Sequence, residues 1–205
     1  MSRATSPYVP PRGDRWSLWA FIVAGAVITV WTAAAGAARI IEVLGPGPVP
    51  VEVQFAGAPA EIATGAAGSL PVEVESAVIR ATELPGVSLA AGVAGPIVTV
   101  LTTATIAICL ALLAYSTLSG RVFSRRNTRL VTTAVLTGLI GFSIANLCST
   151  MLANGAVAWA TDRQLDNLVF AFEPATYIAV AFAGGLIAAV FAIGERLQRD
   201  TEGLI

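Results

Sequence analysis

The chain contains no lysine and no histidine, and only two of its 205 residues are cysteines. The absence of histidine excludes histidine-based acid–base catalysis, Cys/His zinc sites and haem ligation by histidine. Two cysteines, Cys109 and Cys148, provide no disulfide framework. Charged residues are also scarce, at 12%, whereas a typical soluble domain has about 25%. With 56% hydrophobic residues, the composition predicts a protein that is embedded in lipid.

Four apolar windows are long enough to cross a hydrocarbon core, which requires about 20 residues. None of them contains a charged residue in its interior, as the cost of burying charge in lipid demands. They predict a bundle of four transmembrane helices over residues 17–38, 96–118, 130–152 and 174–194. A cleaved signal peptide is an alternative for the first window, but its apolar stretch is longer than the roughly 7–15 residues of such peptides.

Arginine is concentrated on one side of these windows. Nine of the 12 arginines lie in the segments 1–16, 119–129 and 195–205. By the positive-inside rule, both termini are expected in the cytoplasm, with residues 42–95 and 154–173 outside. Abundant Ala, Gly and Arg without lysine are typical of GC-rich coding sequences. We therefore expect a multi-pass protein of a bacterial plasma membrane.

The first outer segment, residues 42–95, has the pattern of a small β-rich insert. Val49, Val51, Val53 and Phe55 alternate with other residues at strand periodicity. A second alternating run, over residues 72–78, places Val72, Val74, Ser76 and Val78 on one face. These runs predict two or three short strands. Because so short a segment makes only a marginal core, we expect its apolar face to pack on the helix ends, on the membrane or on a second copy.

The second outer segment, residues 154–173, contains a predicted amphipathic helix over residues 161–172. Thr161 and Gln164 have the spacing of a capping box. Apolar residues then follow at helical spacing, with charged residues on the opposite face. Such a helix is expected to rest on the outer membrane interface.

Small residues recur at every fourth position of the four windows, which places them on one face of each helix. In lipid, small faces allow close backbone packing, within a bundle or between copies in a homo-oligomer. The candidate packing residues are Gly25, Thr137, Gly141, Ala145 and Gly185, where Gly185 belongs to a repeat of Ala181, Gly185 and Ala189. Asn146 is the most polar residue inside a window, and we expect it to form an interhelical hydrogen bond.

The arginine-rich loop 119–129 and the helical tail 195–205 are the candidate surface for a cytoplasmic partner. The tail has i,i+4 pairs of opposite charge, Glu195 with Arg199 and Arg196 with Asp200, together with apolar side chains. The candidate docking residues are Arg121, Arg125, Arg126, Glu195, Arg196, Leu197, Arg199, Asp200 and Leu204. The alternative is a solvated helix end without a partner.

Three features together resemble a bacterial family of four-span membrane proteins catalogued as domain of unknown function 2975. They are the insert Val49-Pro50-Val51-Glu52-Val53 after the first span, the arginine-rich second loop, and the ending that begins Phe191-Ala192-Ile193-Gly194-Glu195. The resemblance covers the whole chain and implies a plasma-membrane protein without an assigned activity. Such families often lie beside a helix-turn-helix regulator, which implies a membrane partner of that regulator.

No motif of a membrane enzyme is present: Ser-x-x-Lys, His-Glu-x-x-His and the phosphate-binding loop are all missing from the sequence. We therefore expect a non-enzymatic membrane regulator or sensor with no catalytic residue, cofactor or metal. Its expected partners are membrane lipid and a cytoplasmic transcriptional regulator, without direct binding of nucleic acid. The alternatives are a transporter or channel subunit, suggested by threonine-rich helix faces, and an accessory subunit of a larger membrane complex.

Overall fold

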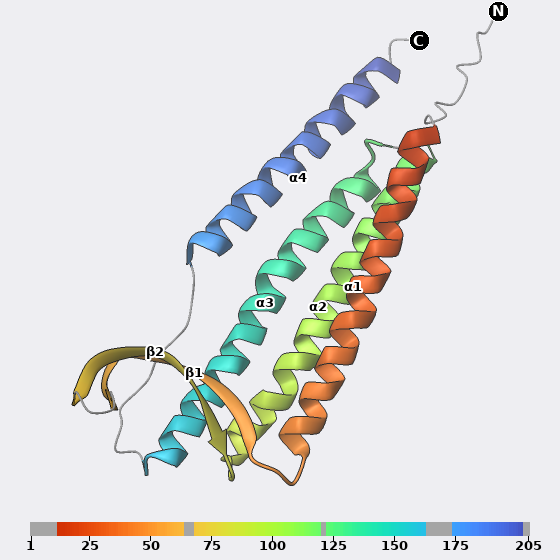
Figure 1. Cartoon of the computed structure of the whole chain (residues 1–205). Helices are drawn as coiled ribbons and strands as arrows, with labels where there is room; N and C mark the ends of the chain where they lie inside the picture. Colours follow the sequence, from red (N-terminus) through yellow and green to blue (C-terminus); the bar gives the residue numbers. More distant parts are fainter. Residues whose placement is uncertain (1–11, 64–67, 120–121, 163–173, 203–205) are drawn as a thin grey trace, which may run out of the picture. The chain divides into compact units, whose positions relative to one another are not determined.

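A computed structural model describes residues 12–63, 68–119, 122–162 and 174–202, which form four long helices and a two-stranded sheet (Figure 1). In chain order the elements are α1 (Arg12–Leu44), β1 (Val49–Ala63), β2 (Ser69–Ala81), α2 (Gly86–Leu118), α3 (Arg125–Ala160) and α4 (Pro174–Glu202). Each helix is long and apolar enough to cross a membrane. The prediction of a mostly helical chain with four candidate spans and a small sheet is thereby confirmed.

The helices extend beyond the apolar windows. Helices α1 and α2 each contain 33 residues and α3 contains 36, which makes them roughly 50–54 Å long. Helix α2 begins at Gly86 and runs through Pro96, where the apolar window begins. Its first turn is closed by a hydrogen bond that the amide of Leu89 donates to the carbonyl of Pro85, at 2.9 Å. Helical structure therefore reaches into the segment predicted as β-rich, because extending a helix is much less costly than nucleating one.

The chain divides into two compact units, which we describe separately. The helical unit comprises Met1–Ala34, Thr99–Phe142 and Glu173–Ile205. The hairpin unit comprises Ala35–Val98 and Ser143–Phe172. Helices α1, α2 and α3 each contribute to both units, whereas the described residues of α4 belong to the helical unit alone.

Small residues mediate the helix contacts of the helical unit. A Cβ atom placed on Gly25 of α1 would lie 3.7 Å from the Cβ atom of Ala107 on α2. A Cβ atom placed on Gly141 of α3 would overlap the side chain of Thr102, which is buried on α2. Both glycines are predicted packing residues, and the structure places both in contacts between helices. Close approach of this kind is the main source of association between helices in lipid.

Helix α4 contacts α3 through a different glycine from the predicted one. A Cβ atom placed on Gly184 would lie 2.5 Å from Cγ1 of Val135, whereas one placed on Gly185 would meet no described atom within 4 Å. Ala181 and Ala189, the other members of the predicted repeat, are exposed. The packed repeat is offset by one residue and comprises Gly184, Ala188 and Ala192. Spacing alone could not separate the two repeats, because adjacent positions in this Ala- and Gly-rich helix have the same period.

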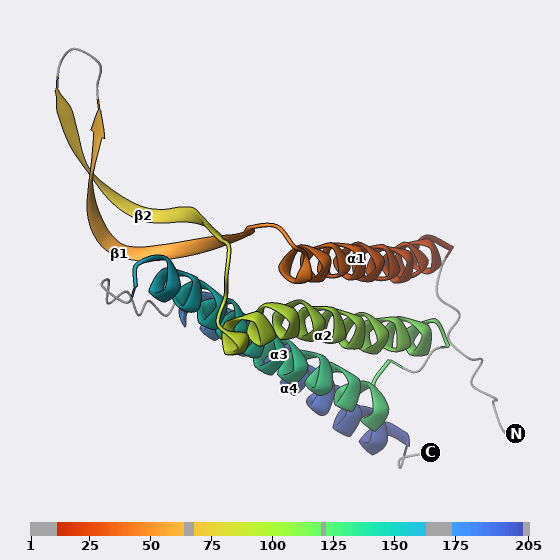
Figure 2. The ribbon, with the colours of Figure 1, turned by 90° about the horizontal axis from the view of Figure 1, so that it is seen from below.

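Strands β1 and β2 form an antiparallel hairpin, which Figures 1 and 2 show as a strongly twisted ribbon. In its first half, Val49, Val51 and Val53 are buried at 5% exposure or less. They pack in one core with Val43 of α1 and with Leu152, Ala156 and Val157 of α3. The guanidinium of Arg39 on α1 also donates a hydrogen bond to the carbonyl of Pro50, at 2.9 Å. Of the three expected coverings of the apolar face, this half of the hairpin uses the helix ends.

The register of the hairpin decides which residues of β2 pack in the core. A bulge lies between Gln54, which pairs with Ser76, and Ala58, which pairs with Val74. On the core side of this bulge, Ile79 pairs with Val51 and packs against the core, whereas Val78 pairs with Glu52 and is 64% exposed. The expectation that Val78 belongs to the packed apolar face of β2 is wrong, because the pairing places Ile79 and Ala81 on that face.

The two faces of the hairpin should differ in their tolerance of side-chain truncation. Val51→Ala removes two buried carbons and should lower the free energy of unfolding of the hairpin unit by roughly 2 kcal/mol. Val78→Ala removes the same atoms from an exposed position and should change it by less than about 0.5 kcal/mol. Hydrogen exchange of the hairpin amides in detergent measures both effects. Equal losses of protection would contradict the observed register.

Helix α3 continues to Ala160 and ends in a turn at Thr161 and Asp162. The amide of Thr161 donates to the carbonyl of Val157 at 3.0 Å, and its hydroxyl donates to the same carbonyl at 2.8 Å. Asp162 has a φ of 49°, in the left-handed region that ends many helices. Thr161 therefore terminates α3. The remainder of the predicted amphipathic helix, including Gln164 of the capping box, lies outside the described residues.

Candidate functional site

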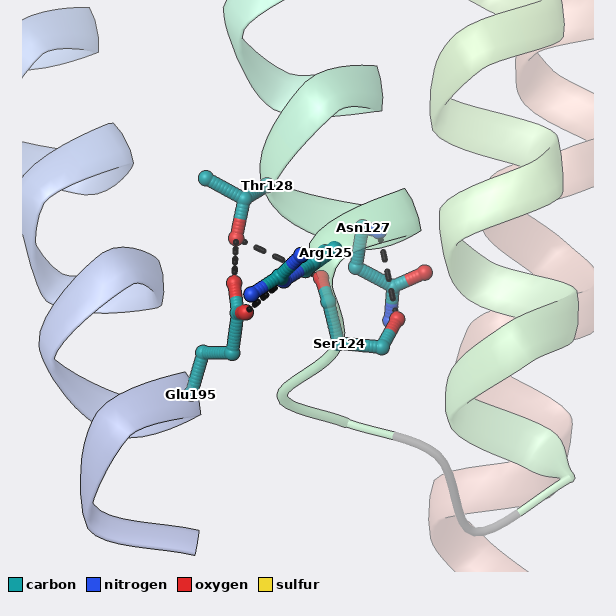
Figure 3. Close-up of polar contacts among 5 residues, drawn as sticks. All are labelled: Ser124, Arg125, Asn127, Thr128 and Glu195. Atoms are coloured by element: carbon teal, nitrogen blue, oxygen red, sulfur yellow. Dashed lines mark hydrogen bonds and ion pairs between the residues drawn. The ribbon is translucent and has the colours of Figure 1, made fainter. Parts of the chain in front are cut away.

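The loop between α2 and α3 meets the last turns of α4 in the helical unit (Figure 3). Ser124 caps the start of α3: its hydroxyl accepts a hydrogen bond from the amide of Asn127 at 3.2 Å, and its carbonyl accepts one from the amide of Thr128 at 3.0 Å. The side chain of Asn127 is fully buried and donates to the carbonyl of Val122 at 2.8 Å. These bonds hold the loop against the first turn of α3.

One carboxylate connects this first turn to α4. The Nε atom of Arg125 donates to Oε1 of Glu195 at 3.2 Å, and the hydroxyl of Thr128 donates to Oε2 at 3.5 Å. The two charged residues are 70 positions apart in the sequence. The side chain of Glu195 is only 16% exposed, whereas that of Arg125 is 72% exposed. Because water screens the arginine, the ion pair contributes no more than about 1 kcal/mol; its main effect is to fix the relative position of loop and tail.

Aromatic packing supports the same junction. The ring centroids of Phe123 in the loop and Phe191 on α4 are 5.7 Å apart, with the planes inclined at 59°. A Cβ atom placed on Gly194 would lie 2.6 Å from Cε1 of Phe123, so the ring occupies space that a side chain at this position would need. Tilted aromatic pairs of this kind stabilise a contact by about 0.5–1.5 kcal/mol beyond the contribution of the apolar area that they bury. We call these residues the α3–α4 clamp: Phe123, Arg125, Thr128, Phe191, Gly194 and Glu195.

The structure separates the predicted docking residues into two groups. Arg125 and Glu195 belong to the clamp, so Glu195 joins the loop to the tail, a role that differs from the predicted docking role. Arg126, Arg196 and Asp200 are exposed, and Leu197 is 62% exposed. Among the described side chains, Arg196 and Asp200 do not form the ion pair that their spacing suggests. Arg121, Leu204 and the side chain of Arg199 lie outside the part of the chain that the structure describes.

The remaining packing candidates have less defined environments. Thr137 is half-buried and lines a shallow pocket on α3 with Thr133 and Ile140. In the hairpin unit, a Cβ atom placed on Gly95 would lie 3.7 Å from the carbonyl oxygen of Ala145, so this residue lies in the contact of α3 with α2. Asn146, in the same unit, is half-buried.

Phe123, Thr128 and Phe191 are members of the junction that sequence reasoning missed. Each looks unremarkable alone: Phe123 as a loop aromatic, Thr128 as a helix residue and Phe191 as a lipid-facing one. The available signal was the glycine at position 194, directly before a charged tail. Among residues that the structure describes, no three His, Cys, Asp or Glu side chains come together as metal ligands. The clamp offers guanidinium, hydroxyl and aromatic groups, which are suited to recognition and positioning.

In comparisons with known proteins, no family model, curated protein or solved structure matches the chain. Its class therefore rests on the fold. Four helices that are long and apolar enough to cross a membrane indicate a multi-pass membrane protein, with a two-stranded sheet inserted between the first two helices.

Proposed function

We propose that this chain is a non-enzymatic regulator or sensor in a bacterial plasma membrane, and that its α2–α3 loop and α4 tail bind a cytoplasmic helix-turn-helix regulator. The observation that carries this proposal is the α3–α4 clamp. It joins two segments that are 70 residues apart and leaves Arg126, Arg196 and Leu197 exposed next to the junction. Two exposed arginines beside an exposed leucine, with the exposed Asp200 one turn further along α4, suit a partner with apolar side chains and charges of both signs. The resemblance to the four-span family of unknown function supports the same proposal.

Helix lengths support a particular placement in the membrane. The hydrocarbon core is about 30 Å thick, and tilts rarely exceed about 40°. The apolar part of α4, Pro174–Leu197, has 24 residues, or about 36 Å, and fits this thickness with moderate tilt. Helices α1, α2 and α3 are too long to fit even at the greatest tilt. We infer that they project from the bilayer at the hairpin end, where the last turns of α1 and α3 and the first turns of α2 pack with β1 and β2 in the core described above.

The arginine distribution supports the orientation. Four described arginines lie on the helix ends that form the clamp, namely Arg125, Arg126, Arg129 and Arg196. The hairpin unit contains Arg39 and Arg80. The positive-inside rule then places the clamp in the cytoplasm and the hairpin outside. In this arrangement a signal that changes the packing of the hairpin acts directly on α1 and α3, because both contribute to the hairpin core.

Labelling of introduced cysteines tests the orientation. In a background without Cys109 and Cys148, Ser69→Cys in β2 should react with a membrane-impermeant maleimide in intact cells. Ser119→Cys, at the exposed end of α2, should react only after permeabilisation. The opposite pattern would reverse the orientation and remove the docking surface from the cytoplasm.

Affinity purification of the full-length chain from its native membrane tests the function. The expected result is co-purification of a soluble helix-turn-helix protein, in an amount comparable to the bait and reduced by high salt. If only other membrane proteins are recovered in comparable amounts, the chain is a subunit of a membrane complex and the proposed function is wrong. Failure to recover any stoichiometric partner from membranes that contain the chain would also count against it.

A further inference from the structure

A groove of about 310 Å³ lies between α1 and α2 in the helical unit. Its walls are almost entirely apolar and include Ile22, Gly25 and Ile28 on α1 and Ile106, Ala107 and Leu110 on α2. The two helices run side by side in both views (Figures 1 and 2). We infer that this groove holds an acyl chain of an anionic phospholipid whose phosphate is bound by Arg15.

The groove exists because small residues line the contact of α1 with α2. Ala24 and Gly25 face Ala107 and Ala111, so the helices touch at Gly25 without filling the space beside the contact. An unfilled apolar space loses dispersion contacts on its whole lining. Along α1 the lining extends from Phe21 to Ile28, or about 11 Å. That length lies within the roughly 15 Å thickness of one leaflet, so it suits the hydrocarbon chain of a lipid better than a ligand that spans the bilayer.

Cationic and aromatic side chains lie on α1 and α2 near one end of this apolar groove. Arg15 precedes Ile22 on α1 by seven residues, or two helical turns, and therefore lies on the same face. Its side chain is exposed, as are those of Trp16 and Trp19. On α2, Tyr115 follows Ala111 by one turn and is 62% exposed. Arginine, tryptophan and tyrosine at one end of a span are the residues that contact phospholipid headgroups and phosphates.

An apolar groove next to an exposed arginine is suited to an occupant that is amphipathic and anionic. A second copy of the chain would have to place a helix in the groove and an acidic group against Arg15. The described part of α4 and the first turns of α3 present mainly arginines at this end, together with Glu195, which is already engaged by the clamp, and the exposed Asp200. Neither carboxylate brings a flexible apolar chain that would fill the groove. An anionic lipid supplies both a flexible chain and a phosphate. The inference rests on the membrane placement proposed above, but not on the proposed partner.

Native mass spectrometry of the full-length protein, with phosphatidylglycerol or phosphatidylcholine added in detergent, tests the site. Wild-type protein should retain about one phosphatidylglycerol per chain and prefer it to phosphatidylcholine about fivefold, the effect of one arginine near a phosphate. Arg15→Gln should abolish that preference. Arg129→Gln, an exposed arginine on the first turns of α3, should leave it unchanged.

A second pair of variants tests the groove itself. Ala24→Phe fills the groove from its wall and should remove most of the retained lipid of both types. Ala26→Phe adds the same side chain at an exposed position of α1 outside the lining and should retain wild-type lipid binding. Equal lipid retention by the two variants, or an unchanged preference in Arg15→Gln, would overturn the proposed site.

The same spectra report the mass of the assembly, which identifies the other occupant. If Ala24→Phe alone converts a dimer into a monomer, the groove is an interface between copies and the lipid proposal is wrong. Resistance of each variant to alkaline extraction from membranes measures insertion separately. Loss of insertion in the wild-type chain would refute the membrane placement, whereas intact insertion without selective lipid binding would refute the site alone.

Discussion

Replacement of Gly184 by leucine is expected to separate α4 from α3. The first added carbon would already lie 2.5 Å from Cγ1 and 2.7 Å from Cγ2 of Val135, well inside van der Waals contact. The further carbons of leucine enlarge the overlap, and overpacking of this kind costs about 3 kcal/mol. For a chain of this size, the melting temperature in detergent should fall by roughly 6–12 °C. Static light scattering or fluorescence during heating would measure the shift.

Gly185→Leu is the matched control, because it makes the same change one residue further along the same helix. No described atom lies within 4 Å of a Cβ at this position. Leucine also has a higher helix propensity than glycine, so the melting temperature should be unchanged or slightly higher. If the two variants lose the same stability, the observed face of α4 is wrong. A loss confined to Gly185→Leu would restore the repeat of Ala181, Gly185 and Ala189 as the packing face.

Deletion of residues 198–205 is expected to abolish binding of the cytoplasmic partner while the protein still inserts in the membrane. The deleted segment follows the apolar span, which ends at Leu197. All members of the α3–α4 clamp precede it, so the contact of loop with tail should remain. Membrane yield should therefore remain close to that of the full-length chain. Recovery of the co-purified regulator should fall by at least about tenfold, because the deletion removes the candidate docking residues Arg199, Asp200 and Leu204.

Two variants separate docking from chain length. Replacement of residues 198–205 by a Gly/Ser segment of equal length should also abolish binding. Leu197→Asp changes an exposed side chain that is outside the clamp and should weaken binding with unchanged membrane yield. If the truncated chain retains its partner, the tail is not the docking surface. If it fails to accumulate, the tail is structural, and the solvated helix end without a partner is the better interpretation.

Much of the fold could be predicted from the sequence, because the relevant forces act locally along the chain. Uninterrupted apolar windows predict the four long helices, since hydrocarbon excludes charge regardless of the neighbours. Alternation of Val49, Val51 and Val53 likewise predicts both a strand and its buried face. The sequence was less informative about where each helix begins and ends. Cooperative extension carries α2 back to Gly86, and composition alone does not show how far a helix continues outside an apolar window.

The candidate site depended far more on tertiary structure. The charge pattern of the tail predicts pairs within the tail, whereas the contact of Glu195 with Arg125 and Thr128 arises because α4 lies next to the start of α3. The local sequence of neither segment predicts this contact. Sequence patterns nevertheless named both Arg125 and Glu195 as candidate docking residues, because the loop 119–129 is rich in arginine and the tail carries pairs of opposite charge.

The sequence by itself determined that this chain has four apolar helices and short strands between the first two, because lipid and strand alternation act on each segment separately. Tertiary structure alone decided which of two adjacent glycines packs, whether Val78 or Ile79 enters the core and that Glu195 contacts Arg125. These outcomes share one physical reason. Helices rich in Ala and Gly and strands with apolar residues on both faces offer several faces of nearly equal local energy, so the choice is made by the shape and charge of the neighbouring element.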